Sequence, residues 1–288
     1  MAKGIKRETA IEFRTAKRST KILVYLTLII ASIVVLLPLF WLISSSLKTQ
    51  QELTFNIWGL PKSPQIINYY KAWTASGINI YMRNSFIVMA ASIIISVVAS
   101  TMLAYVVSRM KFKYNSLLYY IVIVGMMVPI HSYVIPLYID TLNWGMHNNR
   151  LFLGLIYAAS RIPISMFILD GFMKTIPKEL EECATIDGCG VSRTFLQIIL
   201  PLCTDGLVTV TILTAMSSWN ELLLSMLILT NPELKTLPIG LLGFVTEYNT
   251  EYTQLCAALV LCCIPNLVLY ALLQDKIIKG MTLGAVKG

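Results

Sequence analysis

The sequence has little charge. Asp, Glu, Lys and Arg make up only 13% of its 288 residues, whereas about 25% is usual in soluble domains. Four stretches contain none of these residues: 22–47, 84–108, 114–139 and 252–274. Each stretch exceeds the roughly 20 apolar residues that cross the hydrocarbon core of a bilayer. The composition therefore excludes a soluble domain and predicts a protein that lies in a membrane.

Two more apolar segments carry isolated charges. Segment 151–172 is interrupted by Arg161 and Asp170, and segment 207–230 by Glu221. With the four uncharged stretches, they predict six transmembrane helices in one all-α membrane domain. The first stretch follows a basic start, as in a signal peptide, but it is too long for one and is predicted to be an uncleaved span.

The groups that catalysis, metal binding and nucleotide binding require are also scarce. The two histidines, His131 and His147, have no second ligand at suitable spacing, and the six cysteines fit no zinc pattern. No segment has the spacing of a phosphate-binding loop, and no residue set suggests a nucleophile with its base. We therefore expect no catalytic site, metal site or cofactor in this chain, and we expect the cysteines to be packing residues.

The 23 basic residues outnumber the 15 acidic ones, but their positions indicate topology rather than a nucleic-acid partner. Most precede residue 22, lie within 109–113 or 174–193, or follow residue 275. Because basic residues collect on the cytoplasmic side of membrane proteins, both termini are predicted to be cytoplasmic. Residues 1–21 then form a basic N-terminal segment, 22–274 the six-span domain and 275–288 a cytoplasmic tail.

Two further features indicate contacts. The outside segment 44–83 is rich in tryptophan and tyrosine, which suits either anchoring at the membrane surface or contact with a partner. Within the second span, small residues recur every four positions, at Ser92, Ser96, Ser100, Ala104 and Ser108. Such a face favours close packing against another helix.

The predicted cytoplasmic loop 176–201 has the most specific pattern. A helix is predicted to begin at Pro177, with three glutamates in its first turn, where they complement the helix dipole. Gly188 and Gly190 predict a turn, and residues 191–200 predict a second helix. The loop is therefore expected to be a short helix-turn-helix that projects into the cytoplasm.

This loop resembles the EAA motif of permeases from ATP-binding-cassette importers, Glu-Ala-Ala-x-x-x-Gly followed by Ile-x-Leu-Pro. The matching residues are Glu182, Cys183, Ala184, Gly188, Ile198, Leu200 and Pro201. Cys183 replaces the usual alanine, and Asp187 extends the match toward the carbohydrate-uptake branch. Other similar sites lie at 68–69, 84–85, 128–129, 135–138, 219–221 and 284–288. The chain is most similar to the second, MalG-like permease subunit of maltose-type systems.

The resemblance implies a permease subunit in a prokaryotic cytoplasmic membrane, which forms half of the translocation pathway for a sugar or oligosaccharide. It implies three kinds of partner besides the lipid bilayer: a homologous permease that completes a heterodimer, two cytoplasmic ATPase subunits that bind ATP and magnesium, and an extracytoplasmic solute-binding protein. A six-span secondary transporter and a permease for a non-sugar solute are the alternatives.

The resemblance also implies where the ATPase subunits bind. The coupling residues would be Glu182, Cys183, Ala184, Asp187 and Gly188. A second ATPase contact is expected at the tail, at Gly284, Ala285, Val286, Lys287 and Gly288. A solvated terminus is the alternative for the tail, because the segment is too rich in glycine for a helix throughout.

The fifth span carries the candidate translocation pathway. Its candidate residues are Thr211, Thr214, Ser218, Asn220, Glu221 and Ser225. The spacing places the hydroxyls and Glu221 on one helical stripe, with Asn220 on an adjoining face. A carboxylate at the bilayer centre costs on the order of 2.5–3.5 kcal/mol, so Glu221 is expected to face protein or water, and Arg161 is a candidate charge partner. The hydroxyls suit either sugar binding or a helix contact.

Overall fold

The described part of the protein is built from helices. The computed structural model describes residues 18–245 and 251–285, with side chains up to residue 272. Within these residues, four helices are long and apolar enough to cross a membrane. They are α2 (Arg18–Ser46), α5 (Ile78–Arg109), α8 (Arg150–Met173) and α15 (Tyr252–Ala285). The all-α class is confirmed, and these helices correspond to the first, second, fourth and sixth predicted spans.

The third predicted span is broken into two short helices. α6 (Asn115–Met127) stops before Pro129, because a residue that precedes proline is biased away from the helical conformation. A 3-10 turn, η1 (Ile130–Ser132), then leads into α7 (Val134–Asn143). With 13 residues, α6 is about 20 Å long, which is shorter than the hydrocarbon core of a bilayer.

The fifth predicted span is bent at its start and broken at its end. The segment Val191–Leu202 meets α12 (Thr204–Asn220) at an angle of 76°. This segment comprises α10 (Val191–Thr194), the π-helical η2 (Phe195–Ile199) and α11 (Leu200–Leu202). The chain is extended at Glu221, after which α13 (Leu223–Ile228) begins. Four helices, or five if the bent pair is one span, thus have the length and composition of a span in the described residues, where six were predicted.

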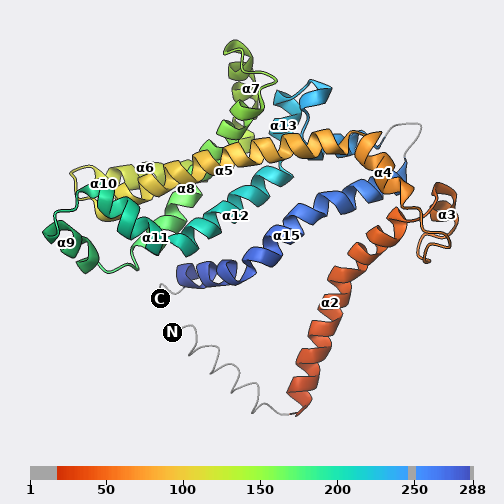
Figure 1. Ribbon diagram of the computed structural model, residues 1–288, viewed down its shortest axis with the longest axis horizontal. Helices are drawn as coiled ribbons and strands as arrows, with labels where there is room; N and C mark the ends of the chain where they lie inside the picture. The colour runs from red at the N-terminus through yellow and green to blue at the C-terminus, as the bar shows by residue number, and fades with distance from the viewer. Residues whose placement is uncertain (1–17, 246–250, 286–288) are drawn as a thin grey trace.

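The helices α5, α8, α12 and α15 lie side by side in an elongated bundle (Figure 1). α2 contacts α15 and diverges from the bundle toward its own N-terminal end, and α7 and α13 project together from one side. At one end of the bundle, here named the α9 end, lies α9 (Glu179–Ile186). The opposite α4 end carries α3 (Gln50–Phe55), α4 (Ile67–Thr74), η3 (Pro232–Leu234) and α14 (Leu237–Leu242).

The small residues of α5 form the centre of the bundle, as predicted. Ser92, Ser96, Ser100 and Ala104 are fully buried, because α8 and α12 pack on this face. The Oγ atom of Ser92 accepts a hydrogen bond from Ser218 of α12 at 3.0 Å. A methyl group added at Gly154 of α8 would lie only 2.7 Å from the methyl of Ala91. Small side chains therefore let the helix backbones approach closely.

Asn84 holds a distant loop at the α4 end. Its side chain is fully buried and donates from Nδ2 to the backbone carbonyls of Glu233 and Lys235, at 2.8 and 2.9 Å. Arg150, at the start of α8, donates to the Asn84 Oδ1 atom at 2.6 Å. One amide therefore joins α5, α8 and the segment around η3.

Asn68 and Lys48 hold the loop between α2 and α5 at the same end. The Asn68 amide donates to the carbonyls of Ser46 and Lys48 at 2.9 and 2.8 Å. The Lys48 side chain is fully buried, and its Nζ atom donates to the carbonyls of Asn56 and Ile57 at 2.8 and 3.0 Å. The α4 end is thus closed by side chains that bond to backbone carbonyls.

Candidate functional site

A cavity of about 590 Å³ lies where α12 ends. Its walls come from η1, from α8, from the last turns of α12 and from the segment that joins α12 to α13. The lining residues are Ile130, His131, Tyr157, Ser160, Arg161, Met216, Ser217, Ser218, Asn220, Glu221, Leu222 and Leu223. Hydroxyl, amide, carboxylate and guanidinium groups together supply donors and acceptors for a solute with many hydroxyl groups.

Glu221 is fixed at the break between α12 and α13. Its carboxylate accepts hydrogen bonds from the N–H groups of Leu224 and Ser225 at 3.0 and 3.2 Å, and so caps the first turn of α13. The hydroxyl of Tyr157, on α8, donates to the same carboxylate. Two segments of the cavity wall therefore meet at this one side chain.

Arg161 does not form the salt bridge with Glu221 that the sequence suggested. In the described part of the chain, the ion pairs between side chains are Arg109–Glu181 and Lys174–Asp170. Arg161 lines the same cavity as Glu221, one helical turn beyond Tyr157. The phenol of Tyr157, rather than the guanidinium of Arg161, contacts the Glu221 carboxylate.

The six candidate pathway residues do not share one environment. Ser218, Asn220 and Glu221 line the cavity, whereas Thr211, Thr214 and Ser225 are not part of its wall. Thr214 and Ser225 are fully buried. The expectation of a single helical stripe is wrong, because α12 ends at Asn220 and Ser225 belongs to α13.

The candidate coupling loop forms two helical pieces around a glycine turn, as predicted. α9 ends in a Schellman motif, in which Gly188 and Cys189 donate to the carbonyls of Thr185 and Ala184 at 3.0 and 2.8 Å. Gly188 has a φ angle of 76°, a left-handed conformation that favours glycine. A methyl group there would meet no atom within 4 Å, so backbone conformation rather than space restricts this position.

The coupling residues of α9 divide between the surface and the interior. Glu182, Cys183, Asp187 and Gly188 are exposed at the α9 end. Ala184 is buried within the chain, with 3% of its surface exposed. The chain itself therefore covers Ala184, and the four exposed residues are accessible on the surface of this loop.

The tail is only partly described. Gly284 and Ala285 are the last residues of α15, so the tail is helical up to residue 285 despite its glycines. The remaining tail candidates, Val286, Lys287 and Gly288, lie outside the described residues.

No cluster of three or more His, Cys, Asp and Glu residues suited to a metal ion occurs in the described ranges. The six cysteines are free thiols. Cys203, Cys256 and Cys262 are buried among the helices, as expected of packing residues, whereas Cys183 is exposed.

Sequence reasoning missed Tyr157 and Ser160 in the cavity wall. Both lie on α8 near Arg161, and Tyr157 precedes it by four residues, which places the two side chains on one face. That spacing was the available signal. It became informative only when the fold placed α8 beside the end of α12.

A membrane-helix bundle around a polar cavity, with a helical loop at one end, defines a membrane transport component. A family model described as the binding-protein-dependent transport system inner membrane component matches residues 96–282, and the chain belongs to this family. It is therefore a multi-pass transport subunit and not an enzyme. The resemblance to permeases of ATP-binding-cassette importers is confirmed.

Several relatives match nearly the whole chain. A putative ABC transporter permease protein ORF2 of Caldicellulosiruptor sp. (strain Rt8B.4) is 37% identical over 94% of this chain and 98% of its own length. The diacetylchitobiose uptake system permease protein NgcG of Streptomyces coelicolor is 32% identical over 90% of this chain and 87% of its own. The melibiose/raffinose/stachyose import permease protein MelC of Bacillus subtilis is 28% identical over 96% of this chain and 100% of its own.

The fold is shared with a solved structure. A crystal structure of a bacterial ABC transporter involved in the import of the acidic polysaccharide alginate contains a chain that matches with a TM-score of 0.80. The match covers 90% of this chain and 98% of that chain at 20% sequence identity. At this identity, the likeness establishes a common fold.

Proposed function

We propose that this chain is a permease subunit of an ATP-binding-cassette importer and forms half of the translocation pathway for a sugar or oligosaccharide. The cavity at the end of α12 carries this proposal, because its hydroxyl, amide and carboxylate groups suit an uncharged solute with many hydroxyl groups. The named relatives that import diacetylchitobiose or melibiose, raffinose and stachyose support the same class of substrate.

The proposed topology has six spans and both termini in the cytoplasm. The segment from α6 to α7 would cross as a broken third span, and the segment from α10 through α13 as a bent and broken fifth. Broken helices are tolerated at membrane depth where they line a cavity, and both breaks lie at the cavity described above. The α9 end is then cytoplasmic, which agrees with the basic residues of 109–113 and 174–193.

The complete transporter would contain four further subunits of three kinds. A homologous permease supplies the other half of the pathway, two cytoplasmic ATPase subunits bind ATP and magnesium, and a solute-binding protein delivers the sugar from outside. On this chain, α9 is the proposed ATPase contact, through the exposed Glu182, Cys183, Asp187 and the turn at Gly188. The tail, Gly284–Gly288, is the second proposed contact.

The transport function is tested in proteoliposomes that contain the permease pair and the ATPase subunits. A panel of radiolabelled oligosaccharides is supplied with the solute-binding protein. We expect uptake of at least one sugar that requires both ATP and the binding protein. Uptake driven by an ion gradient in vesicles without the ATPase subunits would instead favour a secondary transporter.

The location of the pathway is tested with single cysteines at positions 220 and 214. Asn220→Cys places a thiol in the cavity wall, and Thr214→Cys places one in the buried contact between helices. We expect a water-borne thiol reagent to modify the first thiol in at least one state of the ATP cycle and the second in none. Modification of position 214 but not of position 220 would move the pathway away from this cavity.

A further inference from the structure

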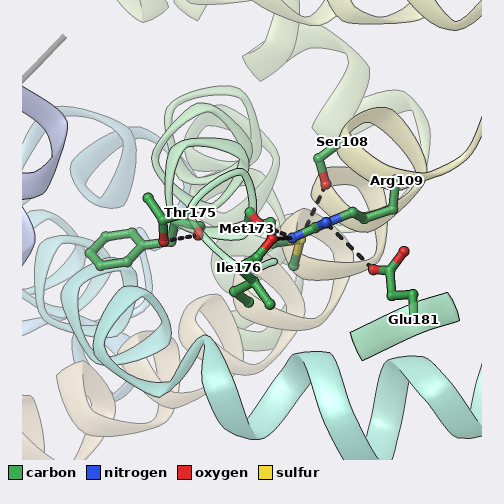
Figure 2. A network of polar contacts seen from close by, with 7 residues as sticks. Ser108, Arg109, Met173, Thr175, Ile176 and Glu181 are labelled. Carbon is green, nitrogen blue, oxygen red and sulfur yellow. Dashed lines mark hydrogen bonds and ion pairs between the residues drawn. The ribbon is translucent and has the colours of Figure 1, made fainter. Parts of the chain in front are cut away.

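Arg109 occupies a buried position at the α9 end of the bundle. It is the last residue of α5, and only 3% of its side chain is exposed. The Nη2 atom of its guanidinium donates to the backbone carbonyls of Met173 and Ile176, the latter at 2.8 Å (Figure 2). Met173 is the last residue of α8, where the negative end of the helix dipole favours a cation, and Ile176 follows in the segment that leads to α9.

The same guanidinium also reaches α9. Its Nε atom lies 3.5 Å from the Oε1 atom of Glu181, in the first turn of α9 (Figure 2). Both atoms are buried and have no hydrogen-bond partner in the described residues, so their contact with each other compensates for the water that each has lost. The second ion pair, Lys174–Asp170, differs because it stays within α8 and its lysine is exposed.

α9 has few other attachments to the bundle. Ala184 is its only buried residue, and residues 174–178 that connect it to α8 form no regular helix after Met173. Beyond α10, the ring of Phe195 packs on Tyr105 of α5, with ring centroids 4.8 Å apart. Tyr105 precedes Arg109 by one helical turn and therefore lies on the same face of α5. The last two turns of α5 thus contact both α9, through Arg109, and the segment after α10, through Tyr105.

We propose that Arg109, paired with Glu181, is a positioning residue that makes α9 move together with the ends of α5 and α8. The proposal rests on the proposed docking of α9 on the ATPase subunits. A displacement of α9 would then pass to α8, which carries Tyr157, Ser160 and Arg161 to the cavity. Without the ion pair, α9 would swing on residues 177–178, which follow the anchored Ile176, and ATP hydrolysis would continue with less transport.

The primary test measures sugar transported per ATP hydrolysed in the complete reconstituted transporter. Glu181→Gln removes the ion pair and leaves the bonds from Arg109 to the carbonyls of Met173 and Ile176 in place. We expect it to lower the ratio about fivefold, with the ATPase rate retained. Arg109→Gln is expected to lower the ratio further, and the double variant to be no worse than Arg109→Gln alone, because both substitutions remove the same interaction.

The matched control is Glu179→Gln. It removes a carboxylate from the same turn of α9, but Glu179 is exposed and has no contact with Arg109. We expect the control to keep the transport ratio of the unsubstituted transporter. An equal loss in Glu179→Gln and Glu181→Gln would overturn the proposal, because it would trace the effect to the charge of α9 rather than to the Arg109–Glu181 ion pair, here named the latch.

A distance measurement separates positioning from general stability. Spin-labelled amino acids at positions 113 and 186, both exposed, report the placement of α9 relative to the end of α5. We expect one narrow distance distribution in the unsubstituted complex and a broad one in Glu181→Gln. Unchanged distributions in both Glu181→Gln and Arg109→Gln, together with an unchanged transport ratio, would overturn the latch.

Crosslinking from position 186 to the ATPase subunits keeps the latch distinct from the proposed docking of α9. Ile186 is 86% exposed, so a photoreactive amino acid there meets any docked subunit. Absence of any crosslink in the unsubstituted transporter would contradict the proposed docking of α9 on the ATPase subunits. If Glu181→Gln and Arg109→Gln both keep the crosslink and a normal ratio of sugar transported per ATP, the docking of α9 stands and only the proposed role of Arg109 is contradicted.

Discussion

At the α4 end, the loops are held by two uncharged amides and a lysine that bond to backbone carbonyls, whereas at the α9 end one guanidinium contacts α9. Asn84 and Asn68 each reach segments far along the chain, and Lys48 closes its own loop. Among the described residues, Arg109 bridges α5, α8 and α9 through polar contacts. The difference indicates a fixed frame at the α4 end and an adjustable element at the α9 end.

The largest effect on stability is expected at the fixed end, from Asn84→Ala. The substitution leaves two partly buried carbonyls and the Arg150 guanidinium without their partner, at a cost of about 3 kcal/mol. Thermal unfolding of the purified protein in detergent measures the loss. Asn79→Ala is the control, because Asn79 is exposed and bonds only to the adjacent Ile80 N–H. Equal stability of the two variants would contradict the fixed frame.

A smaller loss is expected from Lys48→Met, also at the fixed end. The change keeps the buried aliphatic stem but removes the donor to Asn56 and Ile57, which costs about 2 kcal/mol. Faster proteolysis between residues 54 and 62 would report the released loop. Lys62→Met is the exposed control and should leave the cleavage rate unchanged. A resistant loop in Lys48→Met would show that the lysine contributes little.

At the adjustable end, Gly188→Val is expected to cost about 1–2 kcal/mol, because a β-branched residue fits poorly at a positive φ. The strain falls on the turn after α9, so sugar transport per ATP should fall while the complex still assembles. Gly188→Asn is the control, since asparagine tolerates this conformation better. Full coupling in the valine variant would argue against a strict requirement for this turn.

The smallest effect is expected from Arg193→Ala. Arg193 donates to Gln197 at 3.0 Å on the exposed surface of the same loop, and such a pair contributes only about 0.2–0.5 kcal/mol. Thermal unfolding and transport should both stay close to those of the unsubstituted protein. If Arg193→Ala lowered the transport per ATP as much as Arg109→Gln does, any charge on this loop would matter for transport. The special role of Arg109 at the α9 end would then be contradicted.

Much of the architecture follows from the sequence alone. The uncharged stretch 22–47 becomes α2, Arg18–Ser46, because burial in lipid demands both apolar side chains and internal backbone hydrogen bonds. The buried serine face of α5 follows from a spacing of four, and the turn at Gly188 follows from glycine's access to positive φ. Each of these depends on local pattern.

The rest depends on which faces meet in space. No proline or glycine marks the break at Glu221. The break depends instead on the Glu221 side chain, which caps α13 and accepts a hydrogen bond from Tyr157 of another helix. Arg161 is a candidate charge partner of Glu221 because both lie within apolar segments. The sequence does not reveal, however, which face of α8 turns toward Glu221. Arg109 appeared only as one of several cytoplasmic basic residues, since its partners are backbone carbonyls of α8 that leave no trace in residue type.

The Schellman motif at the end of α9 has a consequence for assembly. Its last carbonyls are already satisfied within the chain, so α9 does not need a partner protein to complete its hydrogen bonds. A preformed helix loses less conformational entropy on docking than a segment that folds on contact. The ATPase subunits would therefore meet a ready surface, and the rate of their association would be governed by collision and charge rather than by folding.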